Sequence, residues 1–346
     1  MKKTTTFLWL FFLGIVVIFS GLSVVQAAPK TIELSLTHTI PPHIPFAKLT
    51  QQWADMVAEK TGNRVKINIY WGESLLKASE FYRGVQTGQT DITYYVIGND
   101  WGLMPLNMFT KLGFMGYPSM EVGTEIYHKI WDKFPEIRNE FKKVRVYGAE
   151  MSPPNHLHFT KKAVRVPGDL KGMKIIAMGG SMAEEMAAMG TASMDIKPTD
   201  LYMSLERGLA EGVSIHWPVM QAFGILKLTP YHTVFPGGSI MSVDMLLFNQ
   251  KSWDKLPADV QQVFNDLEPW YIEQVIKMNN GYINMVKGKA KEMGHTVYEP
   301  TAEEMKLWSE AVQPIHEKWI ADTEAKGLPA RKVYEEAKRL LEETAQ

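Results

Sequence analysis

Residues 65–97 read VKINIYWGESLLKASEFYRGVQTGQTDITYYVI, and this stretch sets the fold class. Its first seven residues, 65–71, alternate apolar and polar side chains as a half-buried strand does. Residues 81–86 follow as a short helix that ends at Gly88, and residues 92–97 are almost entirely apolar, as a central strand of a sheet is. A strand, a helix and a strand at this spacing predict an α/β unit built on a parallel sheet.

The pattern continues on both sides of this unit. Upstream, residues 31–38 alternate like a strand, and residues 46–60 carry apolar side chains at helical spacing. Downstream, a second cycle of strands and helices begins at residue 144. Apolar residues keep a period near 3.6 from 260 to 278, and a helix of that length is longer than one lobe needs. We therefore expect two α/β lobes with a ligand cleft between them and a long helix that crosses both.

The expected division into lobes follows from these cycles. Lobe I takes residues 30–152 and 242–280, and lobe II takes residues 153–241 and 281–346. Each lobe is then assembled from two separate pieces of the chain.

The N-terminus has the layout of a secretory signal peptide. Lys2 and Lys3 precede an uninterrupted apolar run at 7–19, and small residues lead up to Ala27. A retained membrane anchor is the alternative, but the run is shorter than the ~20 apolar residues that span a bilayer. We expect residues 1–27 to be cleaved and the mature protein to be periplasmic, without membrane insertion.

Composition and motifs give no indication of an enzyme. The chain has 37 Lys and Arg against 38 Asp and Glu, so no basic surface for nucleic acid is expected. It has no Cys, which excludes thiol catalysis and disulfides, and it lacks the G-x-S-x-G, H-E-x-x-H and P-loop motifs. His156 and His158 fall on one face of a possible strand, but hydrogen-bonded roles are commoner for two histidines. We expect no metal and no cofactor.

The candidate ligand contacts share one feature, since each lies at or just beyond the end of a predicted strand, where open parallel sheets bind ligands. They are His38, Trp71, Glu73, Tyr95, Asn99, Glu150, Ile176, Met178, His216 and Trp217. The aromatic members suit a flat or apolar ligand, although His38, His216 and Trp217 fit structural roles equally well. Glu73 or Glu150, if buried, would suit an amine or hydroxyl donor, and a solvated position is the alternative.

Five stretches in order give the chain a family resemblance. It resembles the solute-binding proteins of tripartite ATP-independent periplasmic (TRAP) transporters, dicarboxylate-binding type. The stretches are LSLTHTIPPHIPFAK (34–48), EKTGNRVKINIYWGESLLKASEFYRGVQTGQTDI (59–92), VPGDLKGMKI (166–175), DLYMSLERGLAEGV (200–213) and LLFNQKSWDKLPADVQQVF (246–264). The resemblance implies a two-lobed periplasmic binding protein fold that closes around a small, usually carboxylate-bearing solute and then docks on a sodium-driven membrane permease.

One departure from the family concerns the ligand. The resemblance implies an arginine after the K-I pair that holds a carboxylate in a bidentate contact, but this chain has Ile176 there. Three interpretations stay open: the ligand lacks a carboxylate or is aromatic, an acid is anchored by another cation, or the site is degenerate. The candidate cations are His216, Arg83 and Lys77. A ligand sensor for a membrane receptor is a further alternative with the same fold.

Overall fold

The computed structural model describes residues 31–98, 102–177, 180–194, 196 and 200–344. The predicted signal peptide, Asn99 and Met178 lie outside the described residues. No described helix is both long and apolar enough to cross a membrane.

The first sheet has the strand order β2-β1-β3-β10-β4. Its strands are β1 (Ile32–Thr37), β2 (Val65–Tyr70), β3 (Ile92–Val96), β4 (Val144–Met151) and β10 (Val243–Asn249). β1 pairs in parallel with β2 and β3, as the sequence predicts. β10 pairs antiparallel with β3 and β4, so β4 runs in the direction of β1 and β3. The carboxyl ends of these parallel strands therefore meet at one edge, where β10 begins.

The second sheet has the strand order β11-β9-β5-β8-β6-β7. Its strands are β5 (His156–Phe159), β6 (Lys174–Ala177), β7 (Ala192–Met194), β8 (Gly212–Ile215), β9 (Tyr231–Thr233) and β11 (Thr296–Tyr298). The chain passes from the first sheet to the second after β4 and returns after β9. This topology gives the two-lobed α/β architecture, whereas the residue boundaries of the lobes stay a prediction.

Helices surround the two sheets. Beside the first sheet are α1 (Pro45–Lys60), α2 (Phe81–Thr87), α3 (Met120–Lys133), α4 (Pro135–Asn139) and α8 (Gln250–Asp254). Beside the second are α5 (Gly180–Ala188), α6 (Leu201–Glu206) and α7 (Trp217–Ala222). Short 3-10 turns are η1 (Ala78–Glu80), η2 (Asn107–Lys111), η3 (Pro167–Leu170) and η5 (Leu226–Leu228).

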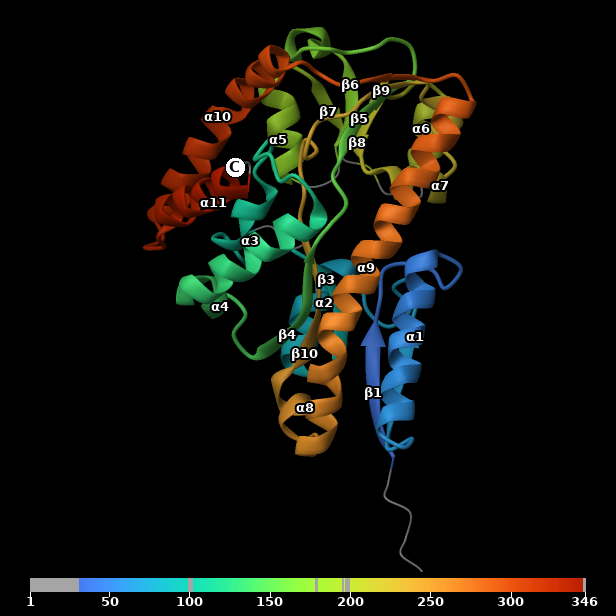
Figure 1. The fold of residues 1–346 in the computed structure, drawn as a ribbon, viewed down its shortest axis with the longest axis vertical. Coiled ribbons are helices and arrows are strands. Elements are labelled where there is room, and N and C mark those ends of the chain that lie inside the picture. Colours follow the sequence, from blue (N-terminus) through green and yellow to red (C-terminus); the bar gives the residue numbers. More distant parts are fainter. Residues whose placement is uncertain (1–30, 99–101, 178–179, 195, 197–199, 345–346) are drawn as a thin grey trace, which may run out of the picture. The chain divides into compact units, whose positions relative to one another are not determined.

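The long helix expected from the sequence is α9 (Ala258–Glu292), which has 35 residues. It packs against α1 and β4 in its first part and against α7 further along, which can be followed in Figure 1. Phe264 and Tyr271 join the apolar core of the first sheet, whereas Val286 and Ala290 join that of the second. One continuous helix thus contributes side chains to both cores.

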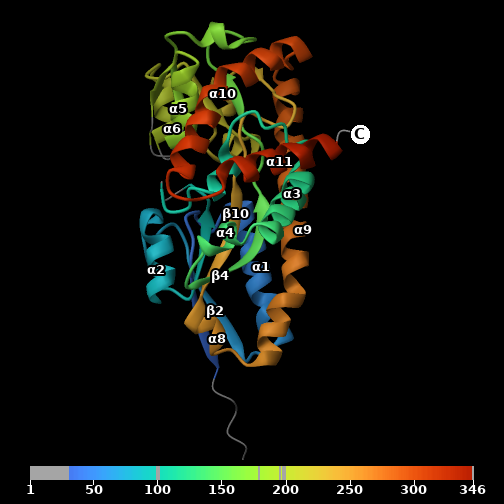
Figure 2. The ribbon, with the colours of Figure 1, turned by 90° about the vertical axis from the view of Figure 1, so that its left-hand side faces the viewer.

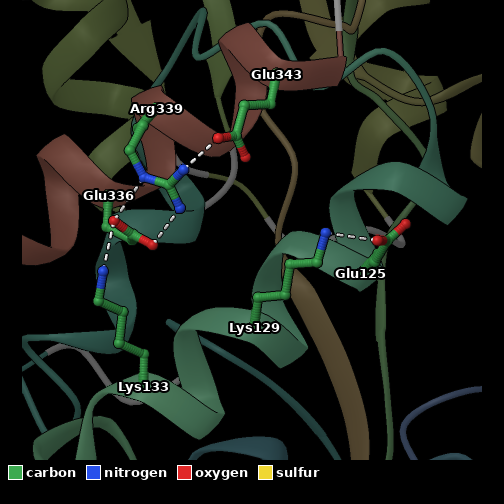
Figure 3. Close-up of polar contacts among 6 residues, drawn as sticks. All are labelled: Glu125, Lys129, Lys133, Glu336, Arg339 and Glu343. Carbon is green, nitrogen blue, oxygen red and sulfur yellow. Dashed lines mark hydrogen bonds and ion pairs between the residues drawn. The ribbon is translucent and has the colours of Figure 1, made fainter.

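The last two helices are α10 (Ala302–Glu324) and α11 (Ala330–Thr344). α11 lies beside α3 (Figure 2) and places Val333 and Ala337 in a core cluster with first-sheet residues. Figure 3 shows the ion pairs at this contact: Glu336 meets Lys133 Nζ at 2.8 Å and Arg339 Nη2 at 2.7 Å. The hydrogen bond from Arg339 lowers the pKa of Glu336 to about 2, so this carboxylate stays ionised.

Candidate functional site

Aromatic side chains gather at the carboxyl edge of the first sheet. The His38 ring, just after β1, stacks on Tyr94 of β3 with 4.4 Å between centroids and 9° between planes. The ring centroid of Trp71 lies 5.4 Å from that of His38, and the ring centroid of Phe46 lies 5.3 Å from that of Tyr94. His38 is buried, whereas Phe46, Trp71 and Tyr94 are only half-buried. We call these four residues the aromatic wall; its half-buried members keep surface for a ligand.

A turn at the end of β2 holds Trp71 in place. Gly72 adopts a left-handed φ of 62°, which glycine tolerates without strain, and Glu73 follows at 60°. The Gly72 N–H donates to the Ile40 carbonyl at 2.9 Å, and the Glu73 N–H donates to the His38 carbonyl at 3.0 Å. These bonds join the loops after β1 and β2, so that Trp71 and His38 lie side by side.

Two acids lie next to the aromatic wall. The Tyr94 hydroxyl donates to Asp244 Oδ2 at 2.6 Å, and Asp244 at the start of β10 lies opposite Glu150 near the end of β4. Glu150 is 2% exposed, and its Oε2 has no hydrogen-bond partner among the described residues. The wall therefore continues into a pair of neighbouring carboxyl groups.

Burial controls the protonation of this pair. It raises the pKa of Glu150 well above its ordinary value, and the charge of Asp244 raises it further. Burial also raises the pKa of Asp244 to about 6, against the hydrogen bonds from Tyr94 and Ser242. Because the two groups lie side by side, they titrate as a pair, and the pair retains about one proton at neutral pH.

His38 adds a hydrogen-bond donor. Burial lowers its pKa to about 3, so the ring is neutral at physiological pH. The Ile40 N–H donates to Nδ1 at 3.3 Å, which assigns the ring hydrogen to Nε2. That buried Nε2 has no partner among the described residues. The edge thus presents one donor and one carboxyl oxygen that the surrounding protein leaves unsatisfied.

Tyr95 lies away from this edge. Its ring is fully buried in a core cluster, 5.6 Å from the ring of Tyr82. Successive residues of a strand point to opposite faces, so Tyr94 and Tyr95 cannot share one. The tyrosine on the aromatic wall is Tyr94, the neighbour of the residue expected from the sequence.

The second sheet presents its candidates differently. Ile176 is fully buried in an apolar cluster with Val213 and Ile215, so its side chain is not exposed at the surface. Trp217 is also fully buried, at 4.8 Å from the His158 ring. His216 is half-buried, and burial lowers its pKa to about 4, so it is neutral at pH 7.

Hydrogen bonds link His158, His232 and His295, whereas the buried Nδ1 of His216 has no partner among the described residues. His158 Nε2 donates to the Ile215 carbonyl at 3.1 Å, and its Nδ1 lies 2.7 Å from His232 Nδ1. His232 Nε2 lies 3.0 Å from His295 Nδ1. In the described part of the chain no three His, Asp or Glu side chains are grouped so as to hold a metal ion. These histidines form a hydrogen-bonded chain within the core.

The candidate cations are also rearranged. Arg83 and Lys77 are exposed, whereas Lys111 of η2 is a cation that the sequence analysis missed. Burial lowers the pKa of Lys111, while the charges of Asp244 and Glu185 oppose that change. Asp244 was missed as well, although it is the one acid in the otherwise apolar VDMLLFN of β10, and that isolation was the available signal.

Comparison with known proteins supports the family resemblance. The family model of bacterial extracellular solute-binding protein family 7 matches residues 36–322. The outer membrane transporter protein TsaT of Comamonas testosteroni is 23% identical over 299 residues, which cover 85% of this chain and 87% of that protein. The C4-dicarboxylate-binding periplasmic protein DctP of Rhodobacter capsulatus is 24% identical over 310 residues, with coverages of 85% and 88%.

A solved structure supports the fold. A TRAP solute-binding protein from Rhodoferax ferrireducens, crystallised with copurified benzoate, superposes with a TM-score of 0.82 at 19% identity. The match covers 91% of this chain and 99% of that one, and at this identity it establishes the fold alone. Because the family model spans most of the sequence, the chain belongs to bacterial extracellular solute-binding protein family 7, and its resemblance to TRAP solute-binding proteins is confirmed.

Proposed function

We propose that this chain is the periplasmic receptor of a TRAP transporter, which captures a small organic solute and delivers it to a sodium-driven permease. The observation that carries the proposal is the edge of the first sheet, where His38 Nε2 and Glu150 Oε2 are buried without partners beside the aromatic wall. Buried polar groups are normally satisfied, so a ligand is the natural partner for these two. Cleavage of the signal peptide and the absence of catalysis are parts of the same proposal.

Closure would use the connections between the sheets. The chain crosses between them after β4 and after β9, and the second connection contains Gly237 and Gly238 at φ values of 72° and 79°. A hinge of this kind lets a solute bound at one sheet gain contacts from the other, which stabilises the closed state. The permease would then recognise the closed form.

The ligand is proposed to be aromatic or to lack a carboxylate at the usual place. Ile176 is buried in apolar surroundings where the family resemblance implies an arginine, and an apolar side chain cannot compensate a buried carboxylate. Of the substitute cations, Arg83 and Lys77 are exposed and His216 is neutral at pH 7. An acid anchored by Lys111 is the second candidate, because this cation is electrostatically coupled to Asp244 beside the wall.

A thermal-shift screen of the purified exported protein tests the proposal, because a ligand that binds only the folded state raises the melting temperature. The panel holds aromatic amines, alcohols and acids together with succinate and malate. We expect aromatic or uncharged solutes to raise the melting temperature more than the two dicarboxylates. A larger shift with succinate or malate would refute the ligand assignment, and no shift with any solute would refute the receptor function.

Gene neighbourhood separates the transporter from a sensor with the same fold. Adjacent genes for a small and a large permease subunit would support transport. An adjacent sensor kinase without permease genes would favour the sensor.

A further inference from the structure

The electrostatic surroundings of the acid pair are negative. The titratable group that acts on Glu150 is Asp244, and those acting on the Tyr94 hydroxyl are Asp244, Glu150 and the neutral Tyr271. Among the described residues, Lys111 is the cation that acts on the pair, through Asp244. In the described part of the chain Lys111 forms no ion pair within 4 Å with either acid. No described cation therefore compensates Glu150.

Glu150 itself points to a missing partner. Its side chain is buried to 2% exposure with Oε2 unpaired, and it faces Asp244 across the strands at the edge already described. Two neighbouring buried carboxyl groups destabilise each other when both ionise. The shared proton relieves this repulsion without a ligand, whereas an added positive charge would stabilise the pair with both groups ionised.

The aromatic wall supplies the second half of a cation site. The half-buried Tyr94 contacts Asp244 through its hydroxyl, and the ring of Phe46 lies 5.3 Å from that of Tyr94. The half-buried Trp71 ring lies 5.4 Å from that of His38, which stacks on Tyr94. Aromatic faces attract ammonium groups through their quadrupoles, and the attraction increases when water is excluded. Rings beside carboxyl groups form a site for a positively charged nitrogen attached to an apolar body.

Resting on the proposed function, we infer that the solute is an organic amine whose protonated nitrogen lies against Tyr94, Asp244 and Glu150 while its apolar part packs on Phe46 and Trp71. A hydroxyl or carbonyl oxygen near the nitrogen would accept the hydrogen of His38 Nε2. The inference explains why the arginine position holds Ile176, since a second cation in the closed site would repel the ligand.

The inference predicts a pH dependence of known sign. Binding of an ammonium group favours ionisation of both acids, so the pair releases its proton when the amine binds. The groups that face the pair are Tyr94, Tyr271 and Lys111; burial raises the pKa of both tyrosines, so they stay neutral, and it lowers that of Lys111. Amine affinity should increase as the pH rises through about 6, the pKa of Asp244.

Three probes of one shape test the charge directly: benzylamine, benzyl alcohol and benzoate. Calorimetric titrations of the full exported protein at about pH 5 and about pH 8 should show benzylamine binding most tightly, with affinity higher at the higher pH and with protons released. Tighter binding of benzoate would overturn the inference while keeping the receptor function. Equal binding of benzyl alcohol would also overturn it. Failure of all three, together with the wider screen, would refute both.

Isosteric variants separate a ligand role from a structural one. Asp244→Asn and Glu150→Gln should each weaken benzylamine binding by about tenfold or more, as loss of a charge-assisted contact does. Because burial opposes their charge, both variants should melt at the same temperature as the wild type or higher. Asp266→Asn, the same change on an exposed side chain of α9, is the control and should alter neither property. Unchanged benzylamine affinity in both variants would overturn the inference.

Discussion

Glu185 on α5 is a buried carboxyl group whose titration should control the stability of the protein. Its side chain is 1% exposed, and its Oε1 accepts a hydrogen bond from the Gly113 N–H at 2.6 Å. Burial raises the pKa of Glu185 from 4.5 to about 8, although the Gly113 bond and the charge of Lys111 oppose the rise. Glu185→Gln keeps an oxygen that can accept the Gly113 bond and removes the titration.

The sign and the size of the effect follow from linkage. Between pH 4.5 and about 8 the folded protein holds a proton on Glu185 that the unfolded chain has lost, so stability decreases as the pH rises. Each pH unit corresponds to about 1.4 kcal/mol, and the window of about 3.5 pH units gives a loss of about 5 kcal/mol. The glutamine variant does not experience this loss.

Urea unfolding followed by circular dichroism measures the difference. At about pH 4.5 wild type and Glu185→Gln should have similar free energies of unfolding, and at about pH 9 the variant should be more stable by about 5 kcal/mol. Glu184→Gln changes the exposed neighbour on the same helix and should follow the wild type at every pH. Parallel curves for wild type and Glu185→Gln would refute the reasoning, because they would show that Glu185 is ionised throughout and stabilised by Lys111.

Three further predictions concern stability. The buried Tyr147 hydroxyl accepts a hydrogen bond from Trp53 Nε1 at 3.0 Å and donates one to the Phe264 carbonyl at 2.9 Å. Tyr147→Phe removes both bonds, and urea unfolding should show that the free energy of unfolding decreases by about 1–3 kcal/mol. Gly148→Ala should cost at least about 1 kcal/mol by the same assay, because φ is +63° and the new Cβ would lie 2.7 Å from the Tyr271 ring. Acidification from about pH 6.5 to about pH 4 should lower the melting temperature, because burial lowers the pKa of seven described histidines, which therefore bind protons more readily after unfolding; these outnumber the described acids of opposite sign, and a flat profile would contradict the assignment. They are His38, His156, His158, His216, His232, His295 and His316.

Local pattern was sufficient for the elements of the fold but not for all of their pairings. Alternation and helical spacing located β2, α2 and β3, and the long apolar period located α9, because each signal depends on near neighbours in the chain. The antiparallel insertion of β10 between β3 and β4 was not predicted. That pairing joins residues about a hundred or more positions apart, and no local preference encodes it.

The packing of α11 against α3 shows a related gap. Residues 330–344 form an amphipathic helix, yet amphipathicity gives the face that is buried and not the partner that covers it. Glu336 forms a local ion pair with Arg339 on the same helix. Its second ion pair, with Lys133, connects helices that are some two hundred residues apart in the sequence. Such contacts follow from the assembled fold.

Strand direction explains why several of the candidate ligand contacts lie together in the structure. His38, Trp71 and Glu150 were placed from strand ends, and the structure brings them to one edge because the strands run in the same direction. Tyr94 and Tyr95 are adjacent on β3, so their side chains point to opposite faces of the strand. The bounds of this strand were predicted closely, but its nearly continuous apolar run does not indicate which face carries the aromatic wall, and the structure places Tyr94 on the wall and Tyr95 in the core.

The two departures from the expected chemistry lie on different sheets and support each other. On the second sheet, Ile176 is part of an apolar core, so this position contributes no positive charge. On the first sheet, Glu150 is buried beside the half-buried Asp244, and Glu150 lacks a described cation within ion-pair distance. Loss of the arginine alone would leave a site indifferent to charge, and an acid pair facing an arginine would form an internal ion pair. Together they make the site negative instead of positive. A cationic solute, which a carboxylate receptor would exclude, can therefore bind to this receptor.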